Sequence, residues 1–221
     1  MLIAGRNAMM VKQDAPVGEF WWLCFTAEEA GSTVALVKAR TPPEITLETS
    51  RDGLVWTPYT IGSTITLANV GDRIFFAAGD GGNTQLGNSI IAYHIFLLSG
   101  RIAASGNIMS LLNRNIALTE ISGNYAFAKL FYGCTSLVTA PKLPATNLKD
   151  YCYYRMFQKC TSLSSVEVAF TDWNAANATK LWLDNVASTG IFRCPTNLGT
   201  NATIARGGNN CPSGWTVINT D

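Results

Sequence analysis

The chain has a single histidine and little charge for its 221 residues, with 16 basic and 15 acidic side chains and a formal net charge of +1. No two basic residues are adjacent, so a nucleic-acid interface built on clustered Lys and Arg is not expected. The longest apolar run, Ile90–Leu98, contains His94 and is much shorter than the about 20 residues of a membrane-spanning helix. We therefore expect neither nucleic-acid binding nor membrane insertion.

Catalytic motifs are also missing. His94 lies inside the apolar run AYHIFLL with no GxSxG frame elsewhere, which favours a core or interface histidine over a triad member. The loop Gly79–Asn83 lacks the Gly-Lys-Ser/Thr of a phosphate loop and the acidic ladder of a calcium loop. We expect no enzyme, no cofactor and no metal site. The acids that could take part in glycoside hydrolysis, none of which lies in a motif, are Glu28, Glu29, Glu120, Glu167 and Asp172.

The six cysteines show no CxxC and no spacing typical of a disulfide framework. The expected role is that of small core residues with reduced thiols. Cys194 and Cys211 are the one pair for which a disulfide stays open as an alternative.

One stretch occurs twice, as YAFAKLFYGCTSL from Tyr125 and as YCYYRMFQKCTSL from Tyr151, with a period of 26 residues (157 − 131 = 26 for the paired Phe). A period of this size with recurring Leu is typical of a leucine-rich solenoid, whose units bury their apolar side only by stacking. We expect each unit to form a helical turn capped by Asn124 or Asp150, a Cys-Thr-Ser turn and a short strand. The two strands are predicted at Leu137–Ala140 and Leu163–Phe170.

The first half reads as short strands separated by turn residues, a spacing that predicts an antiparallel sandwich. Asp52-Gly53 predicts a two-residue hairpin turn, and Trp56 on the return strand is expected to be a buried anchor. The predicted strands are Phe20–Thr26, Thr33–Val37, Glu44–Thr49, Leu54–Thr60, Thr64–Leu67, Arg73–Ala77 and Ile90–Leu98.

These patterns divide the chain into an N-terminal segment (1–18), a β-sandwich (19–104) and a short repeat domain (105–221). Residues 99–123 are predicted to form a capping half-repeat. After the second repeat we expect a helix at Trp173–Val186 and strands at Thr189–Cys194 and Trp215–Ile218. The N-terminal segment is either a loose leader or a tether that docks on a partner, and it has no hydrophobic stretch typical of a signal peptide.

Aromatic residues supply the candidate contact sites. Neighbouring helical positions lie about 100° apart, so Tyr151, Tyr153 and Tyr154 cannot all face one core, and we expect one or two at the surface near Arg155. Exposed Tyr with Arg is typical of binding hot spots, whereas packing under a neighbouring loop is the alternative. Trp21 and Trp22 point to opposite faces of a strand, which suggests a subunit interface.

The run LPATNLKDYCYYRMF, with CTSL after an aromatic stretch, resembles the BspA-type leucine-rich repeats of gut Bacteroidales and of their crAss-like and other phages. The resemblance covers Ser105 to Val217. SRDGLVWTPYT followed by TLANVGDRIFF is similar to the immunoglobulin-like sandwich that precedes such repeats, and GRIAASGNIMSLLN to the junction between them. The implied fold is mainly β, with an Ig-like sandwich followed by a short, capped leucine-rich-repeat solenoid.

This resemblance implies a non-enzymatic structural or attachment protein of a phage particle, on the capsid or the tail. Its expected partners are other virion proteins through the N-terminal region and a host-surface glycan or protein through the repeats. We expect a homo-oligomer, with a trimer favoured, located in the virion and made in the host cytoplasm without a signal peptide. A bacterial surface adhesin or glycan-binding protein is the alternative, and a glycan-cleaving enzyme is a third reading.

Overall fold

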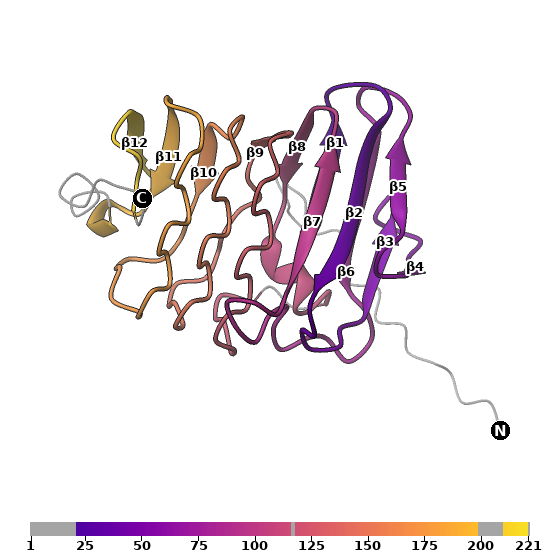
Figure 1. The fold of residues 1–221 in the computed structure, drawn as a ribbon, viewed down its shortest axis with the longest axis horizontal. Helices are drawn as coiled ribbons and strands as arrows, with labels where there is room; N and C mark the ends of the chain where they lie inside the picture. Colours follow the sequence, from indigo (N-terminus) through magenta and orange to yellow (C-terminus); the bar gives the residue numbers. More distant parts are fainter. Residues whose placement is uncertain (1–20, 116–117, 199–209, 221) are drawn as a thin grey trace.

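The computed structural model describes residues 21–115, 118–198 and 210–220, and these residues are mainly β, as expected (Figure 1). The predicted N-terminal segment 1–18 lies outside the described residues.

The short helix η1 (Ile108–Leu111) begins after Asn107, whose side chain accepts a hydrogen bond from the Met109 N–H. The strands are β1 (Leu23–Ala27), β2 (Ser32–Ala39), β3 (Leu47–Ser50), β4 (Thr57–Tyr59), β5 (Thr64–Leu67), β6 (Arg73–Ala78), β7 (Tyr93–Ser99), β8 (Ile102–Ser105), β9 (Leu137–Thr139), β10 (Ser165–Glu167), β11 (Gly190–Cys194) and β12 (Trp215–Asn219).

Two sheets form the N-terminal part of the molecule. The first has the strand order β4-β3-β6-β1-β8-β9 and is antiparallel except for the β8–β9 pair, which is parallel. The second is antiparallel with the order β5-β2-β7, and β2 pairs with β7 from Thr33 to Ala39. Apolar side chains at alternate positions of both sheets point between them, as the period of two in a strand requires.

Aromatic rings fill the space between the two sheets. The rings of Phe25 on β1 and Phe96 on β7 lie 4.9 Å apart, and Phe76 on β6 lies 5.4 Å from Phe96, all edge to face. Tyr59 packs 5.1 Å from Phe76, and its hydroxyl accepts the Leu36 N–H and donates to the Ser63 carbonyl. The Tyr59 hydroxyl thus fixes β4, at the edge of one sheet, against β2 of the other.

The hairpin predicted at Asp52-Gly53 is wider than a two-residue turn. Thr49 pairs with Thr57, so the connection runs through residues 50–56. Asp52 Oδ1 accepts the N–H groups of Leu54 and Val55 and holds this larger loop in shape. Trp56 is only half-buried, so the prediction of a buried anchor was wrong.

The C-terminal part is a stack of rungs, each made of a turn segment and a strand (Figure 1). The turn segments are residues 125–133, 151–159 and 177–185. The strands β10, β11 and β12 are parallel and pair residue by residue, for example Val166 with Phe192 and Phe192 with Val217. Earlier in the stack, β9 is linked to β10 by hydrogen bonds such as that from the Ala140 N–H to the Ser165 carbonyl.

The turn segments are successive β-turns, and the predicted helices, including the one at 173–186, are wrong. In the second segment the N–H groups of Tyr153 and Phe157 donate to carbonyls of the third segment, whereas the Met156 N–H bonds three residues back, to Tyr153. Half of the backbone donors thus close local turns and half join neighbouring rungs. A helix would use all of them internally, and its diameter of about 10 Å exceeds the roughly 4.8 Å spacing of paired strands.

This alternation requires a left-handed backbone at every fourth residue of each turn segment, with φ between 51° and 75°. The same positions recur in each rung, at Tyr125, Lys129 and Gly133, at Tyr151, Arg155 and Lys159, and at Asn177, Leu181 and Asn185. Only Gly and Asn adopt this conformation readily, so most of these positions carry backbone strain. The backbone hydrogen bonds between neighbouring rungs maintain this strained conformation.

The core runs without interruption from the two sheets into the rungs, across the boundary predicted between residues 104 and 105. The parallel β8–β9 pair extends the first sheet into the strand side of the stack. On the other side the Phe96 N–H of β7 donates to the Leu130 carbonyl of the first turn segment. The ring of Phe131 stacks on Phe96 at 5.3 Å and on Phe157 at 5.4 Å, so one aromatic column connects both parts.

Gly133 offers a test of the left-handed positions, because a Cβ placed there would meet no atom within 4 Å. We expect Gly133→Ala to lower the free energy of unfolding by about 1 kcal/mol, since only the positive φ opposes the methyl group. Gly133→Asn should lose less than half as much, because Asn tolerates this conformation. Urea denaturation of the three proteins measures the difference, and an alanine variant as stable as the parent would contradict the assignment.

Candidate functional site

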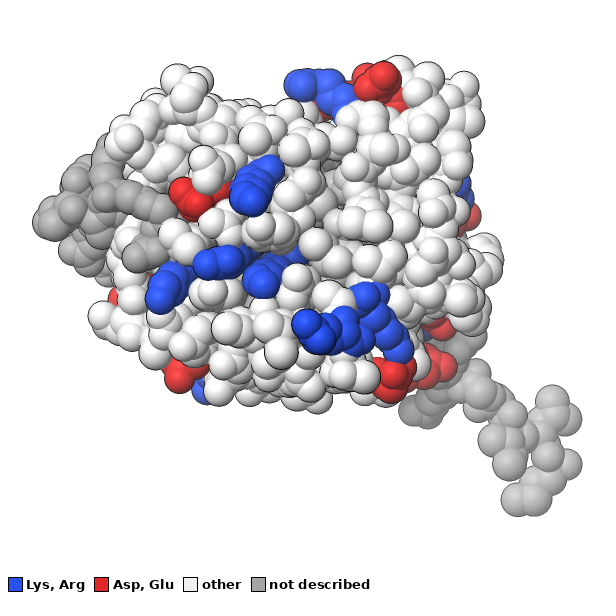
Figure 2. Space-filling model, viewed as in Figure 1, with Lys and Arg blue, Asp and Glu red and all other residues white. Residues whose placement is uncertain are grey.

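The outward side of the turn segments, together with the adjoining outer face of β7, forms a surface that we call the turn face. Figure 2 shows basic side chains in a row across the middle of the side of the molecule seen there, with acidic side chains above and below that row. Four cations belong to the turn segments themselves. They are Lys129 in the first, Arg155 and Lys159 in the second and Lys180 in the third.

Tyrosine rings contact two lysines of the turn face, Lys129 and Lys159. The Lys129 Nζ lies 4.6 Å from the ring centre of Tyr93 on β7 and donates to the Ile90 carbonyl at 2.7 Å. The Tyr132 ring lies between two lysines, with Lys129 Nζ at 5.9 Å and Lys159 Nζ at 5.5 Å. Such cation–π contacts fix ammonium groups that would otherwise move freely on flexible stems.

Arg155 and the tyrosines beside it form the second part of this surface. The Arg155 guanidinium lies 5.2 Å from the Tyr154 ring, and Tyr151 stacks on Tyr125 of the preceding rung at 4.8 Å. Burial, and then the charge of Arg155, lower the pKa of Lys129. The two cations therefore repel one another at the same place on the surface.

The predicted surface residues divide between core and surface. Tyr153 is fully buried, stacks 6.0 Å from Phe127 and offers no surface, so the prediction was wrong for this residue. Tyr154 is largely buried, with its ring against Arg155, whereas Tyr151 and Arg155 are half-buried. Of the three tyrosines, of which one or two were expected at the surface, only Tyr151 is partly exposed, and the helical geometry behind that expectation is absent.

Sequence reasoning missed Lys129, Lys159 and Tyr132, and it also missed Lys180. A signal was present, since Lys129 and Arg155 are 26 residues apart, the same interval that separates Tyr125 from Tyr151. Two cations at equivalent positions of adjacent rungs become neighbours when the rungs stack.

Trp21 and Trp22, the predicted interface residues, behave differently. The half-buried Trp22 donates through Nε1 to the Arg114 carbonyl at 3.1 Å and packs edge to face on Trp56 at 5.1 Å. The Arg114 guanidinium lies 5.4 Å from the Trp56 ring and is paired with Glu48, so this outer face of the first sheet is covered within the chain. Trp21 is 52% exposed.

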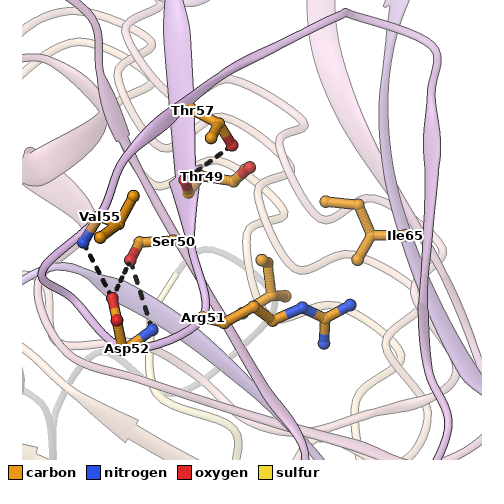
Figure 3. Close-up of a pocket in the computed structure, with 8 residues that line it drawn as sticks. Thr49, Ser50, Arg51, Asp52, Val55, Thr57 and Ile65 are labelled. Atoms are coloured by element: carbon orange, nitrogen blue, oxygen red, sulfur yellow. Dashed lines mark hydrogen bonds between the residues drawn. The ribbon is translucent and has the colours of Figure 1, made fainter.

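A pocket of about 370 Å³ opens beside the loop after β3 (Figure 3). Its charged groups already have structural partners. Asp52 Oδ1 accepts the Val55 N–H and the Ser50 hydroxyl, and these bonds, led by those from backbone N–H groups, lower the pKa of Asp52. The Arg51 guanidinium donates to the carbonyls of Thr66 and Arg73, which ties the loop to β5 and β6. The pocket is lined by Thr49, Ser50, Arg51, Asp52, Val55, Thr57, Ile65 and Ile74.

His94 is fully buried on β7, in agreement with the prediction of a core histidine. Its Nδ1 lies 2.7 Å from the Leu86 carbonyl, which requires a proton on Nδ1, and Nε2 has no hydrogen-bond partner among the described residues. Burial lowers the pKa of His94, an effect that the Leu86 bond opposes. The neutral imidazole is thus the stable form.

All six cysteines are buried thiols, as the sequence predicted, and this includes Cys194 and Cys211. The Cys134 thiol donates to the Phe96 carbonyl and the Cys160 thiol to the Phe131 carbonyl, each in the preceding layer of the stack. Burial raises the pKa of Cys160 to about 12. These thiols are small donors that fit a narrow step between layers, and they are not nucleophiles.

Comparisons with protein-family models, with curated proteins and with solved structures found no match to this chain. Among the described residues there is no group of three or more His, Cys, Asp or Glu side chains arranged to hold a metal ion. The part of the chain that the structure describes also contains no helix with the length and apolarity needed to span a membrane.

The lowered pKa of His94 predicts an acid-sensitive fold. Below pH about 6.5 the unfolded chain takes up a proton that the folded chain resists, so the free energy of unfolding should fall with pH, by at most about 1.4 kcal/mol per pH unit. Urea denaturation at pH 7.5 and 5.5 measures this loss. The carboxyl groups with lowered pKa values, Glu44 and Asp52, contribute mainly at lower pH. His94→Asn, which can keep the donor to Leu86, should remove the dependence, and an equal loss in both proteins would contradict the assignment.

Proposed function

We propose that this chain is a non-enzymatic structural and attachment protein of a bacteriophage particle that infects gut Bacteroidales. In this proposal the N-terminal sheets are an Ig-like sandwich that joins the particle, and the rungs are a short BspA-type leucine-rich-repeat module turned outward to the host surface. The observation that carries the binding role is the turn face, where tyrosines lie beside cations that form no ion pair within the described part of the chain, on segments joined by backbone hydrogen bonds. The virion assignment is supported by the resemblance of the repeat sequence.

The fold part of the proposal is supported by two features of the structure. Two antiparallel sheets enclose an aromatic core, which is the arrangement of a β-sandwich. The turn segments repeat every 26 residues and stack equivalent side chains, and the strands β10 and β11 pair in parallel at the same interval, as expected of a solenoid. The turn segments replace the helices expected in each unit.

Mass spectrometry of purified phage particles, compared with the supernatant and the envelope fraction of the host, tests the assignment. We expect the chain in particles at a fixed ratio to the capsid protein, and its copy number separates capsid decoration from a tail tip. Recovery in the host envelope alone would overturn the virion assignment and favour a bacterial adhesin.

We also propose that the protein is a homo-oligomer, with a trimer favoured. Trp21 is 52% exposed next to Trp22, which packs against Gly53, and the loop beyond Gly53 carries Leu54 and Val55, each 68% exposed. Apolar side chains gathered in this way mark contact surfaces. Light scattering at micromolar concentration should give a multiple of the 23.8 kDa chain mass, and Val55→Lys should lower it. A stable monomer would contradict the proposal.

A further inference from the structure

We propose that the turn face binds an acidic polysaccharide, a polymer with a carboxylate or sulfate on its repeating unit, laid across the rungs. The proposal deepens the proposed function and rests on it for the outward display of this face. Its first support is the pattern of ion pairing. Four cations elsewhere have carboxylate partners, as in Arg101 with Glu28 at 2.8 Å and Lys142 with Glu167 at 3.3 Å, and cations without such a partner among the described residues, such as Arg40 and Lys149, are not grouped on one surface. Within the described ranges, Lys129, Arg155, Lys159 and Lys180 form no ion pair.

The carboxylate of the third turn segment, Asp184, is bonded to side-chain amides and not to a cation of this surface. Asp184 Oδ2 accepts hydrogen bonds from the side-chain amides of Gln158 at 2.8 Å and Asn185 at 2.9 Å. Lys159 meets this residue only through the backbone, where its N–H donates to the Asp184 carbonyl. The two amides thus hold the carboxylate, and among the described residues it forms no ion pair with an ammonium group of the turn face.

The positions of the cations fit a linear polymer. Equivalent residues of adjacent rungs are separated by about 4.8 Å, the spacing of paired strands. Lys129 and Arg155 occupy equivalent positions of the first two rungs, and in the third rung Lys180 lies one residue before the equivalent position (155 + 26 = 181). Their segments are joined by hydrogen bonds from the Lys129 N–H to the Tyr154 carbonyl and from the Arg155 N–H to the Lys180 carbonyl. A chain that carries a charge on each sugar unit presents anions at a comparable repeat. The tyrosine contacts place the ammonium groups before binding, which reduces the entropy lost on association.

The rings themselves argue against nucleic acid as the ligand. Binding of single-stranded nucleic acid depends on aromatic faces that are open to stacking bases. Here Tyr125 and Tyr151 stack on each other at 4.8 Å, and the lysines occupy the rings of Tyr93 and Tyr132. The rings therefore serve to position cations, which suits a ligand recognised by its charge and hydroxyl groups.

The test uses the full chain and an immobilised uronic-acid polymer, polygalacturonate, with neutral dextran as the reference surface. We expect binding to polygalacturonate that falls steeply between about 0.05 and 0.5 M salt, since salt screens exposed charges. The double variant Lys129→Gln with Lys159→Gln, which removes the two cations beside Tyr132, should bind about tenfold more weakly. Circular dichroism and the urea midpoint verify that the variant is folded.

A matched double variant, Arg101→Gln with Lys142→Gln, removes the same charge from two cations that already have carboxylate partners. It should bind like the parent. Equal weakening of both variants, equal binding to dextran, tighter binding of an oligothymidylate, or no binding at all would each overturn the inference. These outcomes are separate from the proposed function, because the particle measurement can succeed while polygalacturonate fails to bind, and the reverse can also occur.

Discussion

The stack depends on an equal spacing along both of its sides. Strands paired by backbone hydrogen bonds lie about 4.8 Å apart, and the rings that stack between turn segments lie 4.8 Å apart at Tyr125 and Tyr151 and 5.4 Å apart at Phe131 and Phe157. If one side of each rung were a helix, that side would be about twice as thick and the stack would curve. The turn segments avoid this, at the cost of a left-handed residue at every fourth position. The narrow step also explains why Cys134 and Cys160 are cysteines, since each thiol must reach a carbonyl of the layer before it.

The same spacing explains how the two N-terminal sheets cover the apolar end of the stack at its first rung. In each N-terminal sheet one strand directs its backbone hydrogen-bonding groups at the first rung, β8 in the first sheet and β7 in the second. β8 pairs with β9, and β7 meets the first turn segment through Phe96 and Leu130. A rung can therefore add to the two sheets as though it were another layer. The aromatic column of Phe96, Phe131 and Phe157 passes through this junction, so the two parts stabilise each other.

The sequence predicted the repeat and most of the strands because both depend on local patterns, but it did not predict β8. β5 (Thr64–Leu67) has the predicted bounds, and β6, β9 and β11 differ from theirs by one residue at one end. It did not reveal the turn segments, because a turn that repeats every four residues places apolar side chains at nearly the period of a helix. Asn124 and Asp150 resemble helix caps for the same reason. The residues of the candidate surface were therefore predicted incompletely, because helical geometry does not place Tyr153 in the core or Lys129 beside Arg155. The contacts of Tyr93 with Lys129 join β7 to the first rung and have no sequence signature.

The backbone hydrogen bonds that join one described turn segment to the next run in one sense, with the N–H in the earlier rung and the carbonyl in the later one. The stack is thus directional and modular. A duplicated 26-residue unit would present the same acceptors to the rung before it and the same donors to the rung after it, so neither end would have to change. Each added or deleted unit would change the length of the stack by about 4.8 Å, the spacing of paired strands. Duplication of the unit in the gene would therefore set the length of the stack in fixed steps.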